Sequence, residues 1–222
     1  MTLLTLSMPW PTLIILFPLG LCLFNFMASL VRLRLMTSDD EREWFAVFFN
    51  PAPSGFTWLY AAVATGMILS PAPITERLLS LLFSLFLFNM TLTDALTGLL
   101  PREMTVSCLI AGLTAALLHP GFTGHILSAV AALGIFGGWR YATTKIHGRE
   151  CLGLGDVWLA GAIAAWLGGH HGLYALLTGV VLFVLWQISV SRSSEGGPMG
   201  PWLCAGAMSV TLLKLYQPLI TW

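Results

Sequence analysis

Charged residues are scarce in this sequence. Asp, Glu, Lys and Arg together make up 9% of its 222 residues, whereas a soluble globular domain has about 25%. Hydrophobic residues make up 57%, so the chain lacks the polar surface that a soluble domain needs on all sides. These values predict an integral membrane protein. We expect residues 1–222 to form a single membrane domain.

Cysteine is also scarce, and no two of the four cysteines form a C-x-x-C pair. Three of them lie within apolar runs, where ordinary buried cysteines are the usual case. This pattern does not indicate a zinc ribbon or a disulfide framework, and we predict no metal site. The formal net charge is zero and no basic stretch is present, so the sequence does not indicate a nucleic-acid partner.

Long apolar runs recur along the whole chain. Several approach the roughly 20 residues that an α-helix needs to cross about 30 Å of hydrocarbon. Pro71 and Pro73 interrupt one of these runs, and a group of glycines interrupts another. The runs predict an all-α fold, a polytopic bundle of about eight transmembrane helices in contact with membrane lipid. The predicted spans are residues 10–30, 56–74, 76–97, 103–119, 125–142, 156–168, 172–190 and 199–217.

The basic residues predict how these spans are oriented, because cytoplasmic segments of membrane proteins are enriched in Lys and Arg. With the N-terminus outside, only Arg77 and Lys214 of the ten Lys and Arg residues fall on or near the outer face. Residues 31–55 then form a short cytoplasmic loop. The other basic residues all fall in cytoplasmic segments: Arg32, Arg34, Arg42, Arg102, Arg140, Lys145, Arg149 and Arg192.

Two aspartates lie at the edges of apolar runs. Asp94 is near the end of the third predicted span, and Asp156 is at the start of the sixth. An even number of crossings separates them, so both are expected at the cytoplasmic face and at the same depth. A carboxylate next to hydrocarbon destabilises a membrane protein, by a few kcal/mol or more at the bilayer centre and less near the interface. We therefore interpret the pair as a reaction site.

Two carboxyl groups that share a site can hydrolyse a peptide bond. They cannot both ionise readily, so one keeps its proton while the other is an anion. The anion takes a proton from water, and the neutral group donates a hydrogen bond to the scissile carbonyl. Gly153 and Gly155 lack side chains just before Asp156, which lets an extended substrate backbone come close. The pattern predicts a membrane aspartyl protease with Asp94 and Asp156 as its catalytic pair.

A small proton-coupled transporter is the main alternative, because it would also keep carboxylates in its membrane helices. Such a protein usually has them near the bilayer midplane, with interrupted helices or an inverted repeat. Here both aspartates are predicted at one face and no internal repeat is present, which favours the protease. An assembly scaffold with degenerate acids is a third possibility, which the absence of cleavage would favour.

The sequence resembles the bacterial prepilin peptidases, a branch of the GxGD membrane aspartyl proteases. The specific part of the resemblance is Asp94 followed by Leu100-Pro101, together with the tetrad Gly153-Leu154-Gly155-Asp156 at the head of an apolar helix. It extends over residues 26–207. Further matching stretches are VRLRLM, FFNPAPSG, AIAAWLGG and GPMGPWL.

The resemblance implies what such a protein does. It implies eight spans in the bacterial inner membrane, and cleavage of the short basic leader of type IV prepilins or pseudopilins on the cytoplasmic side, after a glycine. Asp94 and Asp156 would be catalytic, without a cofactor for proteolysis. We further expect a group of small or rigid residues to contact the substrate: Pro101, Gly153, Gly155 and Gly200.

The sequence departs from the family pattern at three places. Many members carry two C-x-x-C pairs that bind zinc in the first cytoplasmic loop, but no cysteine lies between Cys22 and Cys108 here. Zinc is therefore excluded from that loop. N-methylation of the cleaved product depends on the same region, so it stays open, and S-adenosylmethionine would be a cofactor only if methylation is retained. Trp158 stands where a lysine is common, and Arg102 where an acid or an amide is usual.

Overall fold

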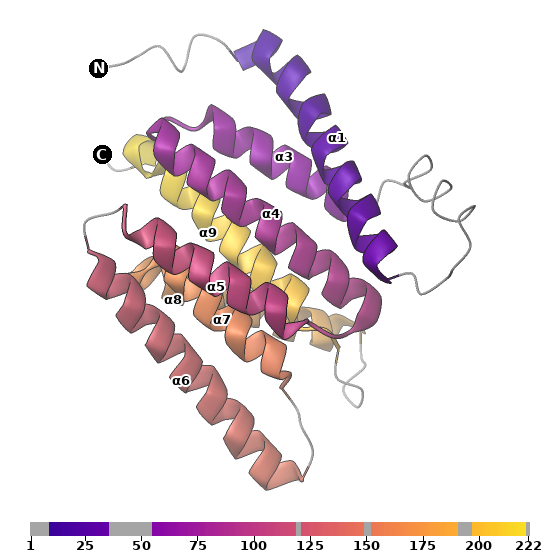
Figure 1. The fold of residues 1–222 in the computed structure, drawn as a ribbon, viewed down its shortest axis with the longest axis vertical. Coiled ribbons are helices and arrows are strands. Elements are labelled where there is room, and N and C mark those ends of the chain that lie inside the picture. Colours follow the sequence, from indigo (N-terminus) through magenta and orange to yellow (C-terminus); the bar gives the residue numbers. More distant parts are fainter. Residues whose placement is uncertain (1–8, 36–54, 119–120, 149–151, 191–196, 221–222) are drawn as a thin grey trace. The chain divides into compact units, whose positions relative to one another are not determined.

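The computed structural model describes residues 9–35, 55–118, 121–148, 152–190 and 197–220. Every regular element in these ranges is an α-helix, which confirms the predicted all-α fold. Each of the eight predicted spans corresponds to one helix, with ends within five residues of those expected. The helices are α1 Pro9–Leu35, α3 Gly55–Leu69, α4 Ile74–Thr97, α5 Arg102–Ala116, α6 Phe122–His147, α7 Leu154–Leu167, α8 Gly169–Val190 and α9 Gly200–Ile220 (Figure 1).

Four of the described helices are long and apolar enough to cross a bilayer. Their apolar segments are Thr12–Arg34, Ile74–Thr97, Phe122–Ile146 and Gly169–Ser189. The helices α3 and α7 are apolar but shorter. The protein is an integral membrane protein, as the low charge content predicted.

The predicted cytoplasmic loop 31–55 lies largely outside the described residues. Its first five residues form the end of α1, and Gly55 begins α3. Three of the arginines that predicted the orientation, Arg42, Arg149 and Arg192, also lie outside the described ranges.

The helices form two compact units. The first comprises residues 1–92 and 215–222, and the second residues 93–214, so the division falls within α4 and within α9. In the first unit α1 packs against α3. An aromatic cluster joins its helices, with the ring of Phe88 4.9 Å from that of Phe24 and 5.2 Å from that of Tyr60. The hydroxyls of Tyr60 and Thr91 share a buried hydrogen bond of 2.7 Å.

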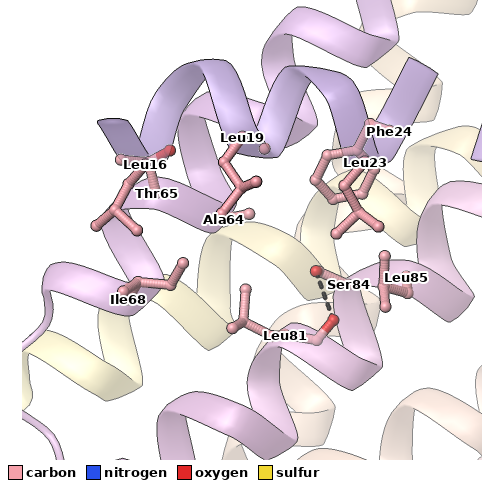
Figure 2. Close-up of a pocket in the computed structure, with 11 residues that line it drawn as sticks. Leu16, Leu19, Leu23, Phe24, Ala64, Thr65, Ile68, Leu81, Ser84 and Leu85 are labelled. Atoms are coloured by element: carbon pink, nitrogen blue, oxygen red, sulfur yellow. Dashed lines mark hydrogen bonds between the residues drawn. The ribbon is translucent and has the colours of Figure 1, made fainter. Parts of the chain in front are cut away.

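The first unit also has an apolar groove of about 200 Å³ between α1, α3 and α4 (Figure 2). Its two hydroxyl groups are bonded within their own helices, Thr65 to the carbonyl of Ala61 and Ser84 to that of Leu81. The surface of the groove is therefore apolar. It is lined by Leu16, Leu19, Gly20, Leu23, Phe24, Ala64, Thr65, Ile68, Leu81, Ser84 and Leu85.

The central helix of the second unit is α7, which contacts α5, α6 and α8. Its residues from Leu159 to Leu167 are all buried. Small residues let the neighbouring helices approach closely, as is common between membrane helices. A Cβ atom at Gly112 of α5 would lie 2.6 Å from the ring of Trp166. The indole nitrogen of Trp166 donates to the carbonyl of Cys108 at 2.9 Å. These contacts fix α7, which carries Asp156, within the unit.

Candidate active site

Asp94 lies in the last turn of α4 and is 4% exposed. The helix ends one turn later because Gly98 adopts a left-handed conformation, with φ of 66°, which glycine tolerates best. The N–H of Gly98 donates to the backbone carbonyl of Asp94 at 2.8 Å. The local sequence thus ends the helix just after the acid and leaves the carboxyl group at its rim.

Gly200, the first residue of α9, orients the carboxylate of Asp94. Its N–H donates to Oδ2 of Asp94 at 3.0 Å in a buried hydrogen bond. A Cβ atom at this position would lie 2.6 Å from the same oxygen, so only glycine fits. The positive end of a helix macrodipole also stabilises an anion. The sequence predicted that Gly200 contacts substrate, and in the structure it lies buried against Asp94.

Asp156 lies in the first turn of α7, after Gly153 as the N-cap residue. Its carboxyl group receives a hydrogen bond from the backbone of Gly153 and interacts electrostatically with Asp94. Both acids belong to the second unit. The structure therefore brings together the two aspartates that the sequence singled out, although 61 residues lie between them in the sequence.

Gly155 brings the connection between α4 and α5 against the start of α7. A Cβ atom at Gly155 would lie 2.6 Å from the carbonyl oxygen of Leu100 and 2.7 Å from its Cβ atom. Pro101 follows as the N-cap residue of α5, with φ of −59° and ψ of 132°. The space beside Gly155, the second glycine of the tetrad, is thus filled by Leu100 of the protein itself, whereas Gly153 is exposed.

Two arginines next to the tetrad were not assigned to the site from the sequence. Arg140 of α6 donates from Nε to the carbonyl of Leu152 at 3.1 Å, directly before Gly153. The guanidinium of Arg102 lies 5.3 Å from the centre of the Trp158 ring. The sequence signal was only their place near the ends of predicted spans, where arginine is common in any membrane protein.

The arrangement suits acid–base chemistry by a pair of carboxyl groups. Each acid is oriented by a backbone hydrogen bond, and each lies at a helix end. A transporter would instead be expected to hold its acids near the middle of the bilayer. In the part of the chain that the structure describes, no three His, Cys, Asp or Glu side chains gather as a metal site would require.

Comparisons with known proteins identify the family. The family model described as the type IV leader peptidase family matches residues 81–188, a range that contains both aspartates. A protein of Escherichia coli (strain K12) named "Prepilin leader peptidase/N-methyltransferase" is 30% identical over 158 residues, which cover 68% of this chain and 70% of that protein. No solved structure matches the chain significantly.

Two further relatives carry the same name. The protein of Pectobacterium carotovorum subsp. carotovorum is 32% identical over 162 residues, and that of Dickeya chrysanthemi is 38% identical over 128 residues. These matches cover 68% and 54% of this chain, and 56% and 45% of the relatives. The chain therefore spans about half the length of these two relatives.

Proposed function

Because the chain belongs to the type IV leader peptidase family, we propose that it is a membrane aspartyl endopeptidase. Its substrates are type IV prepilins or pseudopilins, from which it removes the short basic leader, and Asp94 and Asp156 are its catalytic pair. One observation carries the proposal. Two carboxyl groups from different helices lie in one site, because Leu100, on the connection that follows Asp94, packs against Gly155 directly before Asp156. Gly200 holds Asp94 there by a backbone hydrogen bond.

The proposed reaction needs one proton shared between the two acids. The ionised carboxylate takes a proton from a water molecule, whose oxygen attacks the scissile carbonyl. The protonated acid donates a hydrogen bond to that carbonyl and stabilises the negative charge that develops on it. When the tetrahedral intermediate collapses, the C–N bond breaks and the leaving nitrogen receives a proton. The dyad then returns to its starting state with one proton.

The glycines and Pro101 divide into two groups under this proposal. Gly155 and Gly200 position the acids, because the backbone of Leu100 and the carboxylate of Asp94 occupy the space that a side chain would need. Gly153 is exposed and lies beside the carboxyl group of Asp156, and Pro101 is half-buried and directly follows Leu100, which packs against Gly155. We propose that these two contact the substrate backbone.

The proposed location is the bacterial inner membrane, with the dyad at the cytoplasmic face and lipid around the helices. Two of the arginines that predict this face contact residues beside Asp156, since Arg140 binds Leu152 and Arg102 lies over Trp158. This supports the dyad and the basic residues lying on one side of the membrane, as the positive-inside rule requires for a cytoplasmic site.

N-methylation is not needed for the proposed cleavage. The names of relatives include an N-methyltransferase activity. S-adenosylmethionine would be the methyl donor if this chain retains that activity. Many family members bind zinc in the first cytoplasmic loop with cysteine pairs that this sequence lacks. The residues of that loop therefore do not fit a zinc site of that kind, and no step of the proposed reaction uses zinc.

Cleavage of a model prepilin tests the proposed function. We expect the purified chain to cut after the last glycine of the leader, with the cut located by mass spectrometry. Replacing that glycine with valine should abolish the cut, because a branched side chain shields the scissile bond, and glycine leaves a helix more readily by about 1 kcal/mol relative to alanine. Shuffling the apolar residues beyond the cut is the control and should be tolerated. A cut at other positions, or none, would contradict the proposal.

Metal removal gives an independent prediction. Proteolysis by two carboxyl groups requires no metal, so cleavage should continue at an unchanged rate after dialysis against a strong zinc chelator. The rate should also be unchanged when zinc is added back. Activity that disappears with the chelator and returns with zinc would reveal a metal site and contradict the aspartyl mechanism.

A further inference from the structure

Arg102 lies at a position where its charge does not stabilise α5. It is the first residue of α5, directly after Pro101, and a cation at a helix N-terminus opposes the macrodipole. Its guanidinium lies 5.3 Å from the centre of the Trp158 ring, within the range of a cation–π interaction. The contact joins the start of α5 to the first turns of α7, so its role is in tertiary structure.

This contact acts together with another that holds the connection between α4 and α5 against α7. In that other contact, the backbone of Leu100 occupies the space that a side chain would need at Gly155. The connection begins just after Asp94 and ends at Arg102, while Gly155 and Trp158 lie on either side of Asp156 in the sequence. Any shift of the connection along α7 would therefore change the separation of the two acids.

The geometry also holds the cation away from the acids. Residues two apart on a helix point in directions about 200° apart, so Trp158 and Asp156 lie on nearly opposite sides of α7. A guanidinium beside the dyad would pair with a carboxylate and favour its ionised form, which opposes the sharing of one proton. The indole face of Trp158 gives Arg102 a partner without that consequence.

We propose that Arg102 and Trp158 are positioning residues of the active site, and that their cation–π contact fixes the connection between α4 and α5 on α7 and so sets the separation of Asp94 and Asp156. This inference rests on the proposed function, because its catalytic effect is measured as prepilin cleavage. It requires that the cation and the aromatic face act as a unit.

The test is a double-mutant cycle on the purified chain with a model prepilin. Arg102→Gln and Trp158→Leu should each lower kcat about tenfold, with KM changed less than about twofold, because misplaced catalytic groups slow the chemical step. The double variant should be no slower than either single variant. Arg102→Lys and Trp158→Phe, which keep the cation and the aromatic face, should retain most of the activity.

Replacing the cation–π contact by an ion pair of reversed orientation, which we call the charge exchange, sharpens the test. Arg102→Glu and Trp158→Lys should each be about as slow as the neutral variants, since each alone removes the contact. Combined, they create an ion pair between the same two positions, and kcat should recover to within about threefold of the original value. The matched control is Lys145→Gln. The ammonium of Lys145 lies 5.7 Å from the Tyr141 ring within α6, so it joins no two helices and its loss should leave kcat unchanged.

Thermal unfolding of the same variants in detergent tests the contact between Arg102 and Trp158 independently of the proposed function. The shifts in Tm of Arg102→Gln and Trp158→Leu should be non-additive whether or not the substrate is a prepilin. Additive losses in kcat, failed recovery of the charge exchange, or an Arg102→Gln variant as active as Lys145→Gln would overturn the positioning role while cleavage by the original chain still stands. If the original chain cleaves no prepilin, the proposed function fails and the positioning role fails with it, even where the Tm shifts are coupled.

Discussion

Replacing either Asp94 or Asp156 with asparagine should abolish prepilin cleavage while the protein still inserts into the membrane. Asparagine keeps the size of the side chain and accepts the backbone hydrogen bond that Gly200 donates to Asp94. It can neither take a proton from water nor share one with the other acid. We expect kcat to fall by several orders of magnitude, as in other catalytic units whose members act together.

The double variant distinguishes a catalytic pair from two independent sites. If Asp94 and Asp156 share one proton, Asp94→Asn and Asp156→Asn together should be no slower than either alone. Glu76→Gln is the matched control, because it makes the same chemical change in the first turn of α4 while Asp94 lies in the last turn. Turnover near the original rate in either single aspartate variant would disprove the aspartyl mechanism.

Gly200→Ala should lower kcat about a hundredfold, although Gly200 is not expected to touch the substrate. A Cβ atom there would lie 2.6 Å from Oδ2 and 3.1 Å from Cγ of Asp94, so the carboxyl group must move and the hydrogen bond from Gly200 is lost. A displacement of about 1 Å in a catalytic group can cost about 100-fold in rate. KM should change little, because the substrate-contacting residues proposed above are untouched.

Matched glycine variants separate this effect from general damage to helices. Gly134 and Gly138 of α6 have no heavy atom within 4 Å of the position that a Cβ atom would take. Alanine at either position should leave kcat unchanged and can raise stability by about 0.4–1 kcal/mol, since it restricts the unfolded chain. Steady-state kinetics and Tm in detergent measure both outcomes. A Gly200→Ala variant with the original kcat would show that Asp94 does not depend on this contact.

The sequence by itself determined the membrane character and the number and position of the helices, and it singled out the two acids that the structure brings together. Hydropathy is decisive here because the bilayer requires apolar runs of nearly fixed length. The place of Asp94 and Asp156 at helix ends also follows from local sequence, since Gly98 ends α4 and Gly153 begins α7. Counting the crossings between them was then enough to predict that they share one face.

Only the tertiary structure decided what surrounds the acids. Gly200 contacts Asp94, which is 106 residues away in the sequence. Leu100 occupies the space that a side chain would need at Gly155, and Arg102 lies over the ring of Trp158. From the sequence these glycines were assigned to the substrate and the arginines only to the orientation of the spans. Such contacts depend on which faces of two packed helices meet and at what height. Apolar helices in lipid are nearly uniform on all sides, so their packing follows small residues and single hydrogen bonds that no local pattern marks.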